Sequence, residues 1–154
     1  MRPQQIATAL LLCAMGCGPG RHHWLGDPDL FGVALVVTED AAPFAQAADA
    51  CEHLRRTLLA TSVYFGFDPA DLAGLRIVLQ GPPVQCSGFA GPLLGCYEWE
   101  SNTVTVSTRG VHCLEASPVS HEVLHYFIGD PGHTDPRWTT FVPLWLSLQG
   151  ASCN

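Results

Sequence analysis

Apolar runs separated by turn residues divide the chain into strand-like and helix-like segments. Residues 31–38 form a short, β-branched apolar run that stops at Glu39-Asp40, a pattern typical of a buried strand. From residue 43 to about residue 64, apolar residues and alanines recur at intervals of three and four, which indicates one long packing helix. Further strands are predicted at residues 75–80, and at 96–100 and 103–108 as a hairpin.

A second helix is predicted from Pro118 to about Ile128. Ser117 is a suitable N-cap with proline at the first helical position, and the turn sequence at residues 129–132, GDPG, ends the helix. Its apolar side chains form a stripe that would pack on a core. The order of elements predicts an α+β domain with a mixed sheet of about four strands, the long packing helix and this second helix.

Three polar residues of the long helix lie outside its apolar stripe. His53, Arg55 and Arg56 are therefore predicted to face solvent. Aromatic residues also follow the second helix, at Trp138, Phe141 and Trp145. They are predicted to fill the core, with a place in a substrate pocket as the alternative.

The second helix contains the sequence HEVLH, residues 121–125, an HExxH motif. Residues four apart lie on the same face of a helix, so the imidazoles of His121 and His125 can bind one metal ion. Neutral imidazole favours zinc, and Glu122 can take a proton from a water on the metal and pass it to a leaving amine. The alternative is two histidines that only share a face of a core helix, although a buried glutamate there needs a partner.

A catalytic zinc site needs a third protein ligand. No glutamate follows Glu122, which excludes a glutamate from a later helix. His133 comes after a turn that can fold the chain back toward the metal, and it is the predicted third ligand. Asp130 is the alternative ligand, and a surface histidine without a role is the remaining one.

With His121, Glu122 and His125, the chain resembles the zincin metallopeptidases, whose two histidines bind zinc and whose glutamate is the general base. This resemblance implies a small zincin-like domain, the same three roles here and hydrolysis of peptide bonds. Gly129 and His133 resemble the later part of the metzincin motif HExxHxxGxxH, but they lie one and two places late, and no methionine follows Met15. The chain is therefore zincin-like and not a metzincin. It also resembles small uncharacterised HExxH lipoproteins of bacteria.

The N-terminal segment has the features of a bacterial export signal. Residues 1–16 combine an arginine, a short apolar run and small residues, as in a secretory signal peptide. The apolar run is too short for a membrane-spanning helix, which needs about 20 apolar residues. Cys17 resembles the lipidated cysteine of bacterial lipoproteins. Residues 17–30 are predicted to be a tether and residues 31–154 one domain. Export to the cell envelope, periplasmic or anchored in the outer membrane, or secretion, is expected.

The net charge of the chain limits its possible binding partners, and its cysteines indicate possible disulfides. A net charge of −7 without any lysine argues against nucleic acid or an anionic lipid surface, so the membrane is contacted only through a lipid on Cys17. In an exported protein, cysteines favour disulfides. Cys86 and Cys96 flank a glycine-rich loop and are the first predicted pair; Cys51 with Cys113 is the second. A cysteine-ligated zinc site is the competing interpretation, but the CxxC spacing is absent.

These observations predict a monomeric, zinc-dependent peptidase of the cell envelope that acts on a peptide or protein. In minimal zinc peptidases an edge strand beside the metal can pair with an extended substrate, and one strand of the 96–108 hairpin is the candidate. Tyr97, His112 and Tyr126 are suitable oxyanion partners by residue type, and none is preferred. The alternatives are an envelope lipoprotein that binds zinc or a protein without turnover, and a structural lipoprotein without metal.

Overall fold

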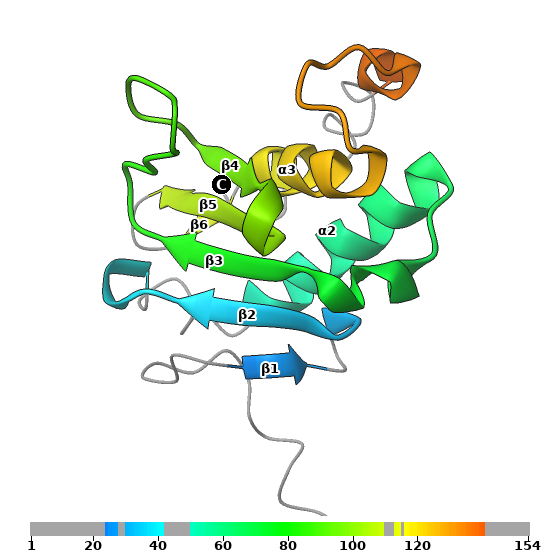
Figure 1. Ribbon diagram of the computed structural model, residues 1–154. Coiled ribbons are helices and arrows are strands. Elements are labelled where there is room, and N and C mark those ends of the chain that lie inside the picture. The colour runs from blue at the N-terminus through cyan, green and yellow to red at the C-terminus, as the bar shows by residue number, and fades with distance from the viewer. Residues whose placement is uncertain (1–23, 28–29, 42–49, 110–112, 115, 141–154) are drawn as a thin grey trace, which may run out of the picture.

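A mixed β-sheet forms one layer of the computed structural model, which describes residues 24–27, 30–41, 50–109, 113–114 and 116–140 (Figure 1). The strand order is β1-β2-β3-β5-β4, and β6 pairs with β5. Strands β2, β3 and β5 are parallel, whereas β1 runs antiparallel to β2 and β4 antiparallel to β5. The strands span Trp24–Asp27 (β1), Val33–Val37 (β2), Arg76–Gln80 (β3), Gly95–Glu98 (β4), Thr103–Arg109 (β5) and Cys113–Leu114 (β6).

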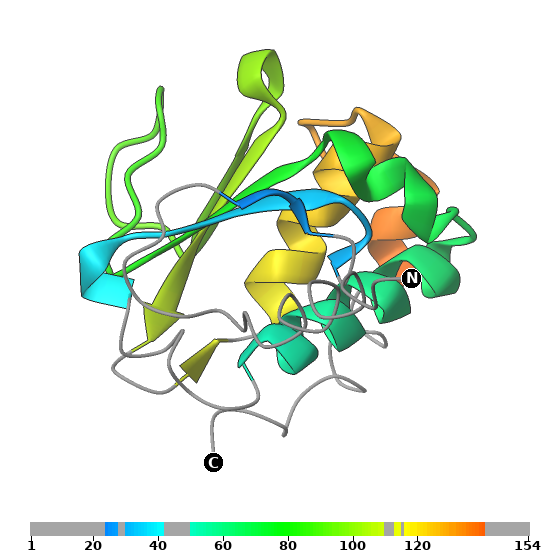
Figure 2. The same ribbon diagram turned by 90° about the horizontal axis from the view of Figure 1, so that it is seen from below.

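Two α-helices, α2 (Ala50–Phe65) and α3 (Ala116–Ile128), pack against each other on one side of the sheet (Figure 2). Helix α2 connects the parallel strands β2 and β3, a connection that requires a crossover of this length. Helix α3 contacts β4 and β5. The predicted α+β architecture is confirmed: the four predicted strands and the two helices are present, and β1 and β6 extend the sheet. Short 3₁₀ helices occur at Glu39–Ala41 (η2), Pro69–Gly74 (η3), Trp99–Ser101 (η4) and Pro136–Thr140 (η5).

The hydrophobic core lies between the sheet and the two helices. Side chains alternate across a strand, so every second residue of the central strands points to the helices. Val119 and Val123 bury one face of α3 against this core and leave the motif residues at its border. The other main contributors are Val33, Leu35, Leu54, Leu58, Ile77, Leu79, Val104 and Val106.

Strand β1 corrects the prediction of a tether over residues 17–30. Residues 24–27 pair with β2, and Leu30 is a buried member of the core. A strand of four residues is too short to show a periodic pattern, and backbone pairing holds it whatever its side chains are. The signal peptide of residues 1–16, Cys17 and most of the tether lie outside the described residues.

The prediction that His53 faces solvent was wrong, because its side chain is only 5% exposed. His53, Thr57 and Thr61 follow one another at intervals of four on α2, and all three are buried. The prediction considered only the apolar stripe of the helix, and this row of polar residues lies outside that stripe. Thr61 Oγ1 lies 2.8 Å from Ser120 Oγ of α3, so the row joins the two helices.

The remaining helix predictions are largely confirmed. Arg55 and Arg56 are on the solvent side, where both pair with Glu52. Residues 43–49 of the predicted long helix lie outside the described residues. Helix α3 begins at Ala116, so Ser117 is inside its first turn and is not the N-cap. A proline two residues into a helix is tolerated there, because the first four N–H groups have no partner within the helix.

Candidate metal centre

Three histidine side chains converge beside the C-terminal half of α3. His121 and His125 lie one turn apart on this helix, and the loop that follows returns His133 to them. The Nε2 atom of His133 is 3.1 Å from the Nε2 atoms of both His121 and His125. His133 has a φ of 55°, a left-handed backbone conformation that helps to turn the loop back. The structure therefore brings together the two histidines of the motif and His133, the predicted third ligand.

The separation of these nitrogen atoms suits a tetrahedral zinc ion. Zn–N bonds of about 2.0–2.1 Å place two imidazole nitrogens roughly 3.3 Å apart. Three neutral imidazoles cannot all form hydrogen bonds with one another. Each ring has one N–H donor, and His125 uses its donor, Nδ1, on the backbone carbonyl of Asp130. Burial, together with the other two histidines, lowers the pKa of His121 to about 4. At neutral pH His121 is thus in the uncharged state that binds zinc.

Asp130 holds the loop that carries His133. Its backbone carbonyl lies 2.8 Å from His125 Nδ1, so that nitrogen donates and Nε2 is left facing the cluster. Its carboxylate accepts hydrogen bonds from the backbone N–H groups of Gly132 and Asp135, which lowers its pKa. Asp130, the alternative third ligand, is not part of the converging set among the described residues.

Trp138 packs against the three histidines. Its ring centroid is 4.9 Å from that of His121, 4.7 Å from that of His125 and 4.4 Å from that of His133. Its indole Nε1 also donates to the Asp130 carboxylate. The prediction that Trp138 fills the core was wrong, because the loop turns it onto the histidine cluster. Phe141 and Trp145 lie outside the described residues.

Glu122 is buried next to the cluster, with 8% of its surface exposed. Burial raises the pKa of its carboxyl group to about 8, and no described residue offsets this with a hydrogen bond or a charge. Space for the side chain comes from Gly95 of β4: a Cβ atom there would lie 3.0 Å from Glu122 Cγ and 3.2 Å from its Oε1. A buried carboxyl group with a raised pKa, lining a cavity and without a partner among the described residues, is a frequent sign of a functional site.

The titration of Glu122 predicts how the stability of the metal-free protein depends on pH. Between about pH 6.5 and pH 8 the folded state keeps a proton on Glu122 that the unfolded state, with its ordinary pKa of 4.5, has lost. His121 and His125 have lowered pKa values in the folded state but titrate near pH 6.5 in the unfolded state, so they oppose this effect at the lower end of the window. Stability should therefore fall by roughly 0.5–1 kcal/mol per pH unit between about pH 7 and pH 8. Urea unfolding should show this decline in the wild type and its loss in Glu122→Gln.

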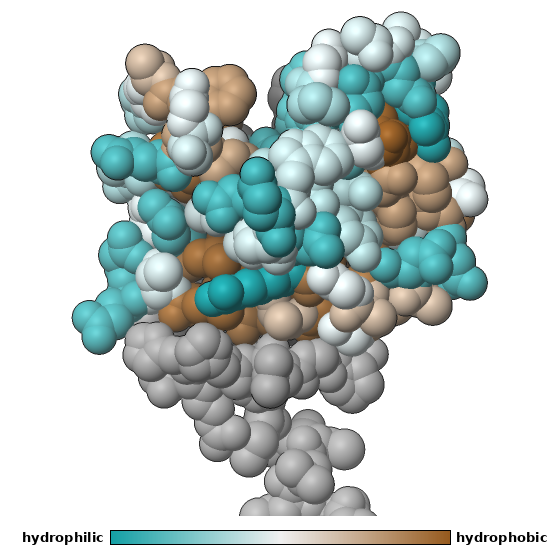
Figure 3. All heavy atoms as spheres, viewed as in Figure 1, coloured by the Kyte–Doolittle hydropathy of each residue, from teal (hydrophilic) through white to brown (hydrophobic). Residues whose placement is uncertain are grey.

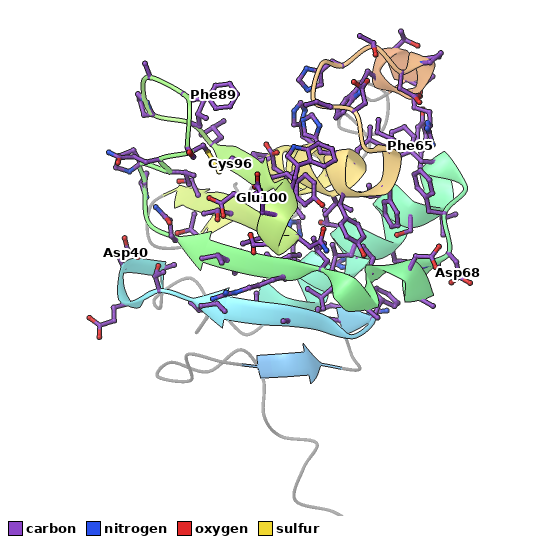
Figure 4. The ribbon with its side chains drawn as sticks, viewed as in Figure 1. Asp40, Phe65, Asp68, Phe89, Cys96 and Glu100 are labelled. Atoms are coloured by element: carbon purple, nitrogen blue, oxygen red, sulfur yellow. A yellow bond between two sulfur atoms is a disulfide. The ribbon has the colours of Figure 1, made fainter. Side chains whose placement is uncertain are left out.

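The cluster opens into a cavity of about 430 Å³ between two projecting parts of the surface (Figure 3). One is the loop between β3 and β4, which carries Phe89, and the other is the loop after α3 (Figure 4). Strand β4, at the end of the sheet, forms part of the floor. The lining residues are Phe89, Leu93, Gly95, Cys96, Tyr97, Trp99, His121, Glu122, His125, Pro131 and His133.

The predicted disulfide between Cys86 and Cys96 is present and ties the β3–β4 loop to strand β4. The second predicted pair falls on side chains of Cys51 and Cys113 that the structure does not describe. Sequence reasoning found the histidines, Glu122 and this disulfide. It did not find Gly95 or Trp138 as parts of the site, because no motif marks a residue that supplies only space or a ring face.

Both candidate tyrosines use their hydroxyl groups elsewhere. Tyr97 donates to Asn102 Oδ1 over 2.8 Å, and Tyr126 donates to the carbonyl of Asp71 over 2.9 Å. Only Tyr97 lines the cavity. The third candidate, His112, lies outside the described residues.

Comparisons with protein-family models, with curated proteins and with solved structures find no significant match to this chain. Among the residues that the structure describes, no helix has both the length and the apolar character to cross a membrane. The interpretation of the site therefore rests on its own geometry.

Proposed function

We propose that the chain is a zinc-dependent peptide-bond hydrolase of the bacterial cell envelope. His121, His125 and His133 bind the metal in this proposal, and Glu122 is the general base. The observation that carries it is the convergence of three imidazole nitrogens next to a buried carboxylate in an open cavity. A histidine cluster with only a structural role would not require a buried glutamate beside it that has no partner among the described residues.

Zinc, when bound, would act as a Lewis acid and would lower the pKa of a water molecule to about 7. Glu122 accepts a proton from the attacking water and returns it to the leaving amine. Burial makes its carboxylate a stronger base than an exposed one, because the charged form is disfavoured. Three neutral ligands leave the full charge of the ion in the site, and this charge favours the ionised form of Glu122 before it accepts the proton.

Strand β4 is the proposed binding edge for the substrate backbone. It is the last strand in the sheet order on the side of α3, and Gly95, Cys96 and Tyr97 line the cavity. An extended peptide can add to such an edge through main-chain hydrogen bonds, which bind many sequences with similar strength. This arrangement would place the peptide between β4 and the histidine loop. That the enzyme acts as a monomer is part of this proposal and rests on the sequence.

Gly95 gives a prediction for catalysis. The Cβ atom of Gly95→Ala would displace the Glu122 carboxyl group, and we expect kcat to fall about tenfold while one zinc stays bound, since small errors in position are costly in catalysis. Steady-state kinetics with metal analysis measures both. Gly132→Ala is the control, because its Cβ would meet nothing closer than 3.6 Å. An unchanged kcat in Gly95→Ala would mean that Glu122 has room to move without loss.

A protein that binds zinc without turnover is the second candidate. It is favoured by the tyrosines, because Tyr97 and Tyr126 donate their hydroxyl groups to Asn102 and Asp71 and not toward the cavity. A peptidase then needs another donor to stabilise the developing oxyanion. Location in the envelope, and a lipid on Cys17, are proposals common to both candidates and rest on the sequence.

Metal analysis and a peptide digest separate these candidates. The purified protein should bind one zinc per chain and cleave members of a mixed synthetic peptide library. A chelator should abolish cleavage, and added zinc should restore it. One tightly bound zinc without any cleavage would support the binding protein. No zinc binding after reconstitution would contradict both candidates and leave HEVLH as a coincidence on a core helix.

A further inference from the structure

Phe89 is the most exposed large hydrophobic residue in the described part of the chain, with 70% of its surface exposed. It lies in the β3–β4 loop and lines the cavity together with Leu93 (Figure 4). Isolated exposed apolar side chains are common, but an aromatic ring at the mouth of a candidate active site offers apolar surface to whatever binds there. Its position therefore bears on which substrates the cavity accepts.

The base of this loop is fixed to the rest of the domain. The Cys86–Cys96 disulfide joins it to β4, and Val84 pairs with Leu93 across it. Val84, both cysteines and Leu93 form a small hydrophobic cluster of their own. A loop closed at its base in two ways presents the Phe89 ring within a restricted region, so contact with a substrate costs less ordering than it would on a free loop.

The glycines on either side of Phe89 shape the tip of the loop. Gly88 has a φ of 83° and Gly91 a φ of 116°, values that side-chain-bearing residues rarely adopt. These turns place Phe89 at the outer end of the loop, across the cavity from the histidine loop (Figure 4).

The charge of the lining indicates the class of side chain that fits. Apart from Glu122 and the three histidines, no Asp, Glu, Lys or Arg is among the lining residues that the structure describes. With the histidines on zinc and Glu122 engaged in proton transfer, no side chain of this described lining remains to pair with a charged substrate group. Such a group would lose its water without gaining a partner, at a cost in binding. Phe89 and Leu93 instead offer a surface for a large apolar side chain.

This surface lies close to the reacting groups. Leu93 is two residues before Gly95, and Gly95 packs against Glu122. Trp99, at the opposite end of β4, lies near His125, with ring centroids 6.4 Å apart. A peptide along β4 would thus have Phe89 and Leu93 beside the end of the strand at which the general base sits.

Resting on the proposed peptidase function, we infer that Phe89 and Leu93 form a subsite that selects peptides with a large apolar side chain next to the scissile bond. The test compares two uncharged synthetic peptide series, in which residues on either side of the cleaved bond are phenylalanine or alanine. In the wild type, kcat/KM should be at least tenfold higher for the best phenylalanine peptide than for its alanine counterpart.

Phe89→Ala should lower this selectivity ratio about tenfold, and Phe89→Leu should retain most of it, because leucine keeps apolar surface at the same place. Val63→Ala is the matched control, since Val63 is an exposed apolar residue of α2 outside the cavity. Bound zinc should stay at one equivalent in all variants.

Two results would overturn the inference and can be told apart. Cleavage by the wild type with an unchanged ratio in Phe89→Ala would reject the subsite and leave the peptidase function standing. If the zinc-loaded wild type cleaved neither peptide series and also no member of a general peptide library, the peptidase function would be rejected, and the subsite with it.

Discussion

Replacing Glu122 by glutamine is expected to lower kcat by a factor of about 10²–10⁴ while one zinc remains bound, since this is the range that a general base contributes. Glutamine has nearly the same shape as glutamate and fits the space next to Gly95, but its amide cannot take a proton from water. Glu122 is also not in the converging ligand set, so its loss should leave the metal site intact. Initial rates on a cleaved peptide, together with metal analysis, measure both effects.

Glu100→Gln is the matched control for this substitution. Glu100 lies on the exposed helix η4, next to cavity residue Trp99, and its replacement removes the same charge without touching the cavity. It should leave kcat within about twofold, as for other exposed surface substitutions. If Glu122→Gln cleaved peptides as fast as the wild type, Glu122 would not be the base, and any cleavage would have to be traced to another group or a contaminating enzyme.

The parts of the site that could be predicted from the sequence are those with a fixed spacing. His121 and His125 lie one turn apart on any helix, so their common face follows from the helix alone. His133 could be selected because a turn sequence precedes it and few ligand types remain after the helix. The Cys86–Cys96 pair was similarly local, with a loop between that can close on itself.

The parts that could not be predicted depend on contacts between distant segments. Gly95 leaves space for the Glu122 side chain because β4 lies against α3. No residue near Gly95 in the sequence indicates this contact. The sequence suggested Asp130 as an alternative ligand and Trp138 as a core residue. In the structure both belong to a hydrogen-bond network within the loop after α3, which forms only when this loop folds back on itself. Local patterns report periodicity and turn chemistry, whereas these roles come from tertiary packing.

The fold shows the same division. The strands at residues 33–37, 76–80 and 103–109 were recognisable because each is a run of β-branched or apolar residues between turns. Strand β1 was missed because its sequence, WLGD, carries no pattern, and its pairing with β2 holds it. The position of His53 was predicted wrongly because the buried row to which it belongs on α2 continues with two threonines, Thr57 and Thr61, which are not counted in an apolar stripe.

Replacing His133 by alanine should weaken zinc binding more than any other change in the loop after α3. The Nε2 atom of His133 is 3.1 Å from the same atoms of both other histidines, so its removal takes away one of three ligand atoms. Loss of a group that only orients a ligand typically costs 10–100-fold in affinity, and loss of a ligand should exceed about 100-fold. Competition with a chromophoric chelator measures the dissociation constant.

Asp130→Ala distinguishes a ligand from a residue that orients one. Its carboxylate binds the Asp135 N–H and the Trp138 indole, and its backbone carbonyl, which alanine keeps, accepts from His125. The expected loss of zinc affinity is therefore the smaller one, about 10–100-fold. Thr139→Ala is the control, because the exposed Thr139 hydroxyl donates to the carbonyl of Pro136 and not to Asp130, and it should change affinity less than threefold, as surface changes typically do. If Asp130→Ala weakened zinc binding more than His133→Ala, the third ligand would be the carboxylate, and the loop would have to rearrange when the metal binds.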